Sequence, residues 1–116
     1  MPVQMSRERF EELVGDALDL IPRRFTEAMS NVVILVEDIA PDNQNLVGLY
    51  HGIALTRRTS NYSGALPDQI FIYRLPILAI CHTEEQVVRQ VAITVVHEVG
   101  HHFGIDDATL HELGWG

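Results

Sequence analysis

The sequence predicts an α+β fold, in which a small mixed sheet of three to four strands packs on an N-terminal helix and a long second helix, with a short helix at the C-terminal end. Two observations support this prediction. Apolar residues recur at helical spacing near the start of the chain and again over residues 84–103, and three short apolar runs with the composition of strands lie between them. Helices and strands are therefore segregated along the chain, which favours α+β over α/β.

The composition indicates one small globular domain covering residues 1–116, because 47% of the residues are hydrophobic and 21% are charged. The formal net charge of −8 argues against nucleic-acid binding through phosphates and provides no basic patch for an anionic membrane surface. The single cysteine, Cys81, cannot form an internal disulfide. Neither a signal peptide nor an apolar run of about 20 residues is recognisable, so a cytoplasmic location is expected.

The first helix is predicted to begin after Ser6, a good N-cap residue, and to carry its apolar face to about Ile21. Pro22 should end this helix or begin a short following turn. We expect Phe25 and Met29, which follow that turn, to point inward.

Three segments are predicted as strands. Residues 32–36 are apolar on both faces and read as a strand well inside a sheet. Residues 46–55 form the second candidate, in which Gly48 and Gly52 indicate a bulge or a close approach of another segment. Residues 69–75 form the third, which Pro76 should end. Residues 56–68, between the second and third strands, are predicted to be irregular.

The long helix is predicted to start at Thr83, which forms a capping box with Gln86, and to run about twenty residues to Phe103. Its many valines lower helix propensity slightly, so burial must compensate and the helix should be central. Gly104 is suited to the left-handed residue that ends such a helix. Asp106 or Asp107 would then cap a last short helix.

The end of this long helix carries the motif HExxH, formed by His97, Glu98 and His101. Positions four apart lie about 40° apart around a helix and one turn along it, so both imidazoles can reach one metal ion. The glutamate next to the first histidine can contact a metal-bound water without being a ligand itself. His102 lies about 100° around the helix from His101, so we expect it beside the ligands or at the surface.

The extended stretch HEVGHHFGIDD resembles the zinc-binding motif of the metzincin branch of zincin metallopeptidases, with an aspartate where the third histidine usually stands. The whole chain is similar to the bacterial minimal zincin family of zincin-like metallopeptidases, including a Leu-Gly-Trp near the end. The resemblance implies one catalytic Zn²⁺ held by His97, His101 and Asp107, with Glu98 as general base. It also implies that a peptide or protein substrate binds along strand 69–75 as the edge of the sheet.

The residues themselves leave the third ligand open. Gly104 lets the chain reverse, and three further residues are a suitable length for Asp107 to return to the metal, where a carboxylate is an acceptable zinc ligand. Alternatively, Asp107 only caps the last helix and Asp106 is the ligand. Glu112 would suit a ligand on a later helix but follows a short connection, and His111 is the least favoured candidate.

A zinc-dependent metallopeptidase is therefore the leading hypothesis. The alternative is a zinc-binding interaction or regulatory module of the same fold with little or no peptidase activity. A metal-dependent ribonuclease is disfavoured by Glu98, by an aspartate in the third position and by the net charge of −8. A structural zinc is least favoured, because structural sites are usually closed by four ligands and rich in cysteine. No oligomeric state is predicted.

Overall fold

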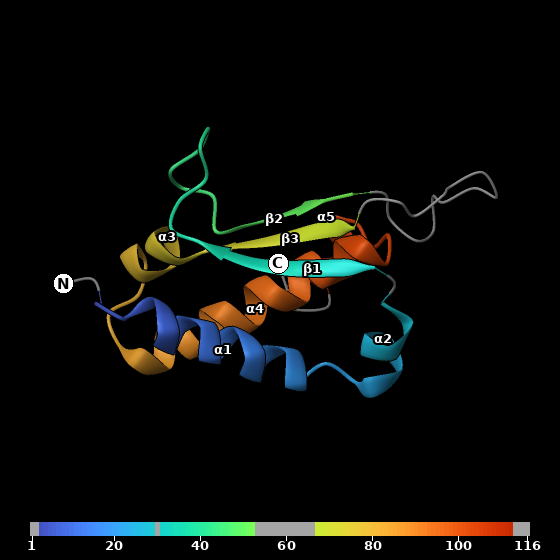
Figure 1. Cartoon of the computed structure of the whole chain (residues 1–116), viewed down its shortest axis with the longest axis horizontal. Coiled ribbons are helices and arrows are strands. Elements are labelled where there is room, and N and C mark those ends of the chain that lie inside the picture. The colour runs from blue at the N-terminus through green and yellow to red at the C-terminus, as the bar shows by residue number, and fades with distance from the viewer. Residues whose placement is uncertain (1–2, 30, 53–66, 113–116) are drawn as a thin grey trace.

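The computed structural model describes residues 3–29, 31–52 and 67–112. Within these ranges it has five helices and a three-stranded mixed sheet, which confirms the predicted α+β class (Figure 1). The helices are α1 (Arg7–Asp19), α2 (Arg23–Ala28), α3 (Arg74–Ala79), α4 (Glu84–His102) and α5 (Asp107–Glu112), and the strands are β1 (Val32–Glu37), β2 (Gly48–His51) and β3 (Asp68–Tyr73). In the described part of the chain, no helix has the length and apolar character needed to cross a membrane.

Helix α1 forms as predicted. The Ser6 hydroxyl accepts a hydrogen bond from the Arg9 N–H at 3.1 Å, which caps the first turn. After Pro22 the outcome is mixed. Met29 packs partly buried against the core, but Phe25 is 38% exposed rather than inward, because its ring lies edge-on against Phe103 at the rim of the core with 5.7 Å between ring centroids.

The strand order is β1-β3-β2, so β3 is the central strand of the sheet. Strand β1 is parallel to β3, with Val32 opposite Asp68, and β2 is antiparallel to it, with Gly48 opposite Ile72. Two expectations are therefore wrong: among the described residues, residues 32–36 form an edge strand, and strand 69–75 is not an edge because it is paired on both sides. An apolar run is typical of a strand with buried side chains, but it does not indicate how many strands pair with it. On β1 even the burial is incomplete, because Val33 is 38% exposed.

The boundary between β3 and α3 also differs from the prediction. Arg74 and Leu75, expected at the end of the strand, begin helix α3. Pro76 is tolerated in the first helical turn, where its missing N–H has no partner to lose. In this position the Arg74 guanidinium donates hydrogen bonds to an Asp38 carboxylate oxygen at 3.0 Å and to the Met5 carbonyl oxygen at 2.8 Å.

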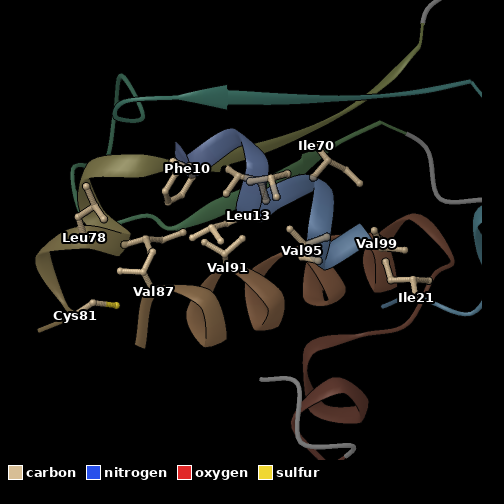
Figure 2. Packing of buried hydrophobic residues seen from close by; sticks show 14 residues of the cluster. Phe10, Leu13, Ile21, Ile70, Leu78, Cys81, Val87, Val91, Val95 and Val99 are labelled. Atoms are coloured by element: carbon tan, nitrogen blue, oxygen red, sulfur yellow. The ribbon is translucent and has the colours of Figure 1, made fainter. Parts of the chain in front are cut away.

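Helix α4 is the centre of the molecule. Thr83 accepts the Gln86 N–H at 3.1 Å, as the capping box predicts, whereas the Gln86 side chain accepts from the N–H of His82 rather than from that of Thr83. Both long helices, α1 and α4, lie on one face of the sheet (Figure 1). Figure 2 shows the valines of α4 pointing into the space between the sheet and α1, and Val87, Val91 and Val95 are fully buried there.

Some predictions fall on residues outside the described ranges. They are the last residues of the second strand, 53–55, all of the segment 56–68 except its last two residues, and the Leu-Gly-Trp of residues 113–115. The last residue of that irregular segment, Asp68, is described, and it is not in a surface loop. It is the buried first residue of β3.

Candidate metal centre

Three side chains of the described chain meet at the end of α4. His97 Nε2 and His101 Nε2 lie 3.1 Å apart. One carboxylate oxygen of Asp107, Oδ1, lies 3.1 Å from His97 Nε2 and 2.9 Å from His101 Nε2. Tetrahedral zinc with nitrogen and oxygen ligands at about 2.0–2.1 Å requires ligand atoms about 3.3 Å apart. The triangle of donor atoms thus has nearly the size that one such ion requires.

The two imidazoles are placed by helix geometry alone. His97 and His101 stand four residues apart on the last turns of α4, with their rings nearly perpendicular and 4.7 Å between centroids. Both side chains are about one quarter exposed, so the site opens to solvent on one side. An open side is what a site that binds both water and a substrate needs.

Asp107 is placed by the turn between α4 and α5. Gly104 has φ 82°, in the left-handed region, as the sequence predicts, and its N–H donates to the His101 carbonyl oxygen at 2.9 Å. The next N–H, of Ile105, donates to the Gly100 carbonyl oxygen at 2.9 Å. These two bonds fold the chain back over the last turn of α4, and α5 then begins at Asp107.

The cap of α5 is Asp106, because its carboxylate accepts the Thr109 N–H at 2.8 Å. This hydrogen bond lowers the pKa of Asp106. The two aspartates thus have different contacts: Asp106 caps a helix and Asp107 faces the imidazoles. Among the described residues, His97, Glu98 and His101 form a cluster with ligand atoms within 4.8 Å of one another, and Asp107, His111 and Glu112 all lie outside it. Asp107 differs from the other two in its distances of 3.1 and 2.9 Å to the two imidazoles.

Glu98 lies under strand β2. It is only 6% exposed, and this burial raises the pKa of its carboxyl to about 7. The nearby charge of His97 and a hydrogen bond from the Tyr50 backbone N–H act in the opposite direction, and the Asp107 charge adds to the increase. A Cβ on Gly48 would lie 2.7 Å from the Thr94 Cγ2 and 3.2 Å from Glu98 Oε2. The close approach that the sequence allowed at Gly48 is therefore real, and it is what buries Glu98.

A cleft of about 810 Å³ passes in front of these groups. One side is strand β2 with the residues just before and after it, and the other is the end of α4 with the turn leading to α5. Its described lining carries carboxylates and apolar side chains and has no arginine: it consists of Leu46, Gly48, Leu49, Tyr50, Gly52, His97, Glu98, His101, Gly104, Ile105, Asp106 and Asp107.

The sequence did not predict a second cluster of polar side chains, which lies behind the cleft. His102 is fully buried, and its Nδ1 lies 3.0 Å from Asp68 Oδ2. The Tyr50 hydroxyl donates to the same oxygen at 2.6 Å. A signal for Asp68 was present: it stands two residues before Ile70 and four before Ile72, which places it on the same inward face of the strand.

Comparison with known proteins agrees with this architecture. A family model described as zincin-like metallopeptidase matches residues 29–115. No curated protein matches the chain. Among solved structures, the chain is similar to one described as a "conserved hypothetical protein" from Thermo thermophilus, with 21% sequence identity and a TM-score of 0.56. The match covers 94% of this chain and 97% of that one, and at this identity it shows a shared fold.

Proposed function

The chain belongs to the zincin-like metallopeptidase family, and on that basis we propose that it is a zinc-dependent peptidase. In this proposal His97, His101 and Asp107 hold one zinc ion and Glu98 is the general base. The supporting observation is the triangle of two imidazole nitrogens and one carboxylate oxygen, with sides of 2.9–3.1 Å, directly beside a buried glutamate. Three protein ligands leave a fourth position for water, as in catalytic zinc sites.

A zinc ion held there supplies a Lewis acid and a water of lowered pKa. The chain's own contribution is Glu98, which takes the proton of that water and delivers it to the nitrogen of the leaving amine. Its carboxylate is suited to this role because the Tyr50 N–H and the close approach of Gly48 restrict where it can lie. Because the carboxylate of Glu98 is already held in place, the reaction does not have to overcome the entropic cost of orienting it in each turnover.

The peptide would lie along β2 rather than along β3, the strand expected from the sequence. Within the described residues, β2 is paired with β3 on one side only. The consecutive residues Gly48, Leu49 and Tyr50 all line the cleft, so the unpaired edge of the strand faces it. An extended peptide can form main-chain hydrogen bonds with such an edge, which would bring its scissile bond past the imidazoles.

The test compares Glu98→Gln with the wild type. We expect Glu98→Gln to bind one zinc ion per chain and to lose hydrolysis of a mixed peptide library by about 10²–10⁴-fold, since a general base contributes about that much. Glu85→Gln is the matched control, because Glu85 is an exposed glutamate in the first turn of the same helix.

Hydrolysis retained in Glu98→Gln would disprove the role of Glu98. A wild-type protein that binds zinc yet cleaves no member of the library would instead favour a zinc-binding module without peptidase activity.

A further inference from the structure

Helix α4 presents two adjacent polar stripes at its end. His97 and His101 form one stripe, which lines the cleft. Thr94, Glu98 and His102, which also recur every four residues, form a second stripe, and of these Glu98 also lines the cleft. Gly48 of β2 lies against Thr94 and Glu98 at one end of this second stripe. At its other end, the ring of Tyr50 on β2 meets that of His102 edge-on, 5.8 Å between centroids. The second stripe therefore faces β2.

The second stripe ends in a buried polar network formed by three elements. Tyr50 comes from β2, Asp68 from β3 and His102 from α4. Asp68 Oδ2 receives the Tyr50 hydroxyl at 2.6 Å and lies 3.0 Å from His102 Nδ1, and the Tyr50 hydroxyl lies 3.4 Å from that same nitrogen. Asp68 and His102 are buried inside an otherwise apolar core and Tyr50 is partly buried, and such groups are costly unless they pair, so the network keeps the three elements in one arrangement.

Strand β2 is shaped to lie directly on two buried carboxylates. Gly48 and Tyr50 of β2 share its inward face, because side chains two apart lie on the same face, and Gly52 follows one residue after the strand. A Cβ on Gly48 would lie 3.2 Å from Glu98 Oε2, and a Cβ on Gly52 would lie 2.5 Å from the Asp68 Oδ1. The glycines let the backbone contact one carboxylate at each end, and the tyrosine between them touches both: its N–H donates to Glu98 and its hydroxyl to Asp68.

We propose that Tyr50, Asp68 and His102 are a positioning unit that holds β2 against α4 and, through the Tyr50 N–H, fixes the carboxylate of Glu98. Its effect on catalysis rests on the proposed peptidase function, whereas its effect on β2 does not. The three donor atoms of the metal triangle all come from α4 and from the first residue of α5. Loss of the unit should therefore misplace the base and the peptide-binding edge and leave metal affinity nearly unchanged.

The first arm of the test uses metal-free protein and needs no activity. In Tyr50→Phe, hydrogen exchange of the amide at position 50, followed by NMR, should accelerate by about tenfold or more, because β2 opens locally. Exchange of the Val91 amide, in the buried middle of α4, should stay unchanged. Unchanged exchange at position 50, or equal acceleration at both positions, would overturn the proposal.

Two substitutions of Asp68 should accelerate exchange at position 50 to different extents. Asp68→Asn retains an oxygen that can accept the Tyr50 hydroxyl, so it should accelerate exchange at position 50 less than Asp68→Ala does. Val87→Ala is the control for simple destabilisation, because Val87 is fully buried on the same helix about 15 Å along its axis from His97. Equal exchange at position 50 in Asp68→Asn and Asp68→Ala, or acceleration there in Val87→Ala to the extent seen in Tyr50→Phe, would contradict the proposal.

The second arm measures catalysis in zinc-loaded protein. Tyr50→Phe should lower kcat by about 10–100-fold and raise KM, because both the base and the peptide-binding edge move, with zinc affinity within about threefold of the wild type; small misplacements of a catalytic group have effects of this size on kcat. An unchanged kcat, or a loss of zinc affinity as large as the loss of kcat, would overturn the catalytic part. If the wild type cleaves no peptide, the proposed function fails, and the exchange arm alone then decides the positioning role.

Discussion

Both halves of α4 bury valines, but only the second half also buries ionisable side chains. The first half buries Val87 and Val91, which are fully enclosed by other apolar side chains (Figure 2). The second half buries Glu98 and His102, which are 6% and 0% exposed and face hydrogen-bonding groups of β2 and β3. The first half determines where the helix lies, because apolar packing is strong but undirected. The second half determines how its last turns are oriented, because hydrogen bonds have direction.

This difference also separates stability from function along one helix. Buried valines contribute favourable transfer free energy, whereas a buried carboxyl or imidazole costs desolvation that its partners only partly return. The buried valines of α4 therefore stabilise the fold enough to tolerate the costly polar groups of its second half, and the two imidazoles of the proposed zinc site, His97 and His101, lie in that half.

The largest effect concerns the pH dependence of stability in metal-free protein. The folded pKa of Glu98 is raised from 4.5 to about 7, so the folded state holds this proton more tightly than the unfolded state does. The stability that the proton contributes is complete below pH 4.5 and is lost as the pH rises through about 7. Wild type should therefore lose about 3 kcal/mol relative to Glu98→Gln across this range. Urea denaturation with chelator present measures it, and a pH-independent difference would refute the assignment.

The next effect belongs to the first half of α4. Val91→Ala removes two methyl groups from a fully buried site and should reduce the free energy of unfolding by about 2–3 kcal/mol. Zinc affinity and peptide hydrolysis per folded molecule should remain within about twofold of the wild type, because no polar contact changes. Denaturant unfolding and chelator competition give the two numbers, and a large loss of zinc affinity would show that the halves are not separable.

A smaller effect is expected where β2 meets the second half of α4. Gly48→Ala introduces a Cβ at 2.7 Å from the Thr94 methyl carbon, which forces β2 and α4 apart. We expect a stability loss of about 2 kcal/mol, typical of overpacking, and a fall in hydrolysis of about tenfold or more. Gly15→Ala is the matched control, because a Cβ there meets nothing within 4 Å. The contrast fails if both variants behave alike.

The smallest effect is at the turn after α4. Gly104 has φ 82°, so Gly104→Ala should cost about 1 kcal/mol of stability, the strain of a non-glycine residue in the left-handed region. Gly104→Asn should cost less, since asparagine tolerates this region better. Thermal unfolding of the two variants tests the order, and equal or reversed stabilities would contradict it.

The features that the sequence predicted are those set by local chemistry. Ser6 and Thr83 cap helices wherever they precede one, the spacing of His97 and His101 holds in any α-helix, and Gly104 suits a left-handed residue in any fold. These signals depend on a few neighbouring residues, so they hold independently of how the rest of the chain folds.

The features that escaped prediction depend on pairings distant in sequence. The central position of β3 follows from β1 and β2 both pairing with it, which alternation within one strand cannot reveal. Asp68 and His102 are 34 residues apart, and although the spacing of Asp68 from Ile70 and Ile72 indicates an inward position, nothing in the sequence pairs it with His102. The choice between Asp106 and Asp107 likewise depended on which carboxylate caps α5.

Zinc affinity of two matched variants tests the central claim most directly. Asp107→Asn and Asp106→Asn are the same change at neighbouring positions, and asparagine at 106 retains an oxygen for the Thr109 N–H. With wild type binding one zinc per chain, chelator competition should show affinity reduced by about 100-fold or more in Asp107→Asn and within about threefold of wild type in Asp106→Asn. The reverse order, or full affinity in Asp107→Asn, would contradict a zinc site formed by His97, His101 and Asp107.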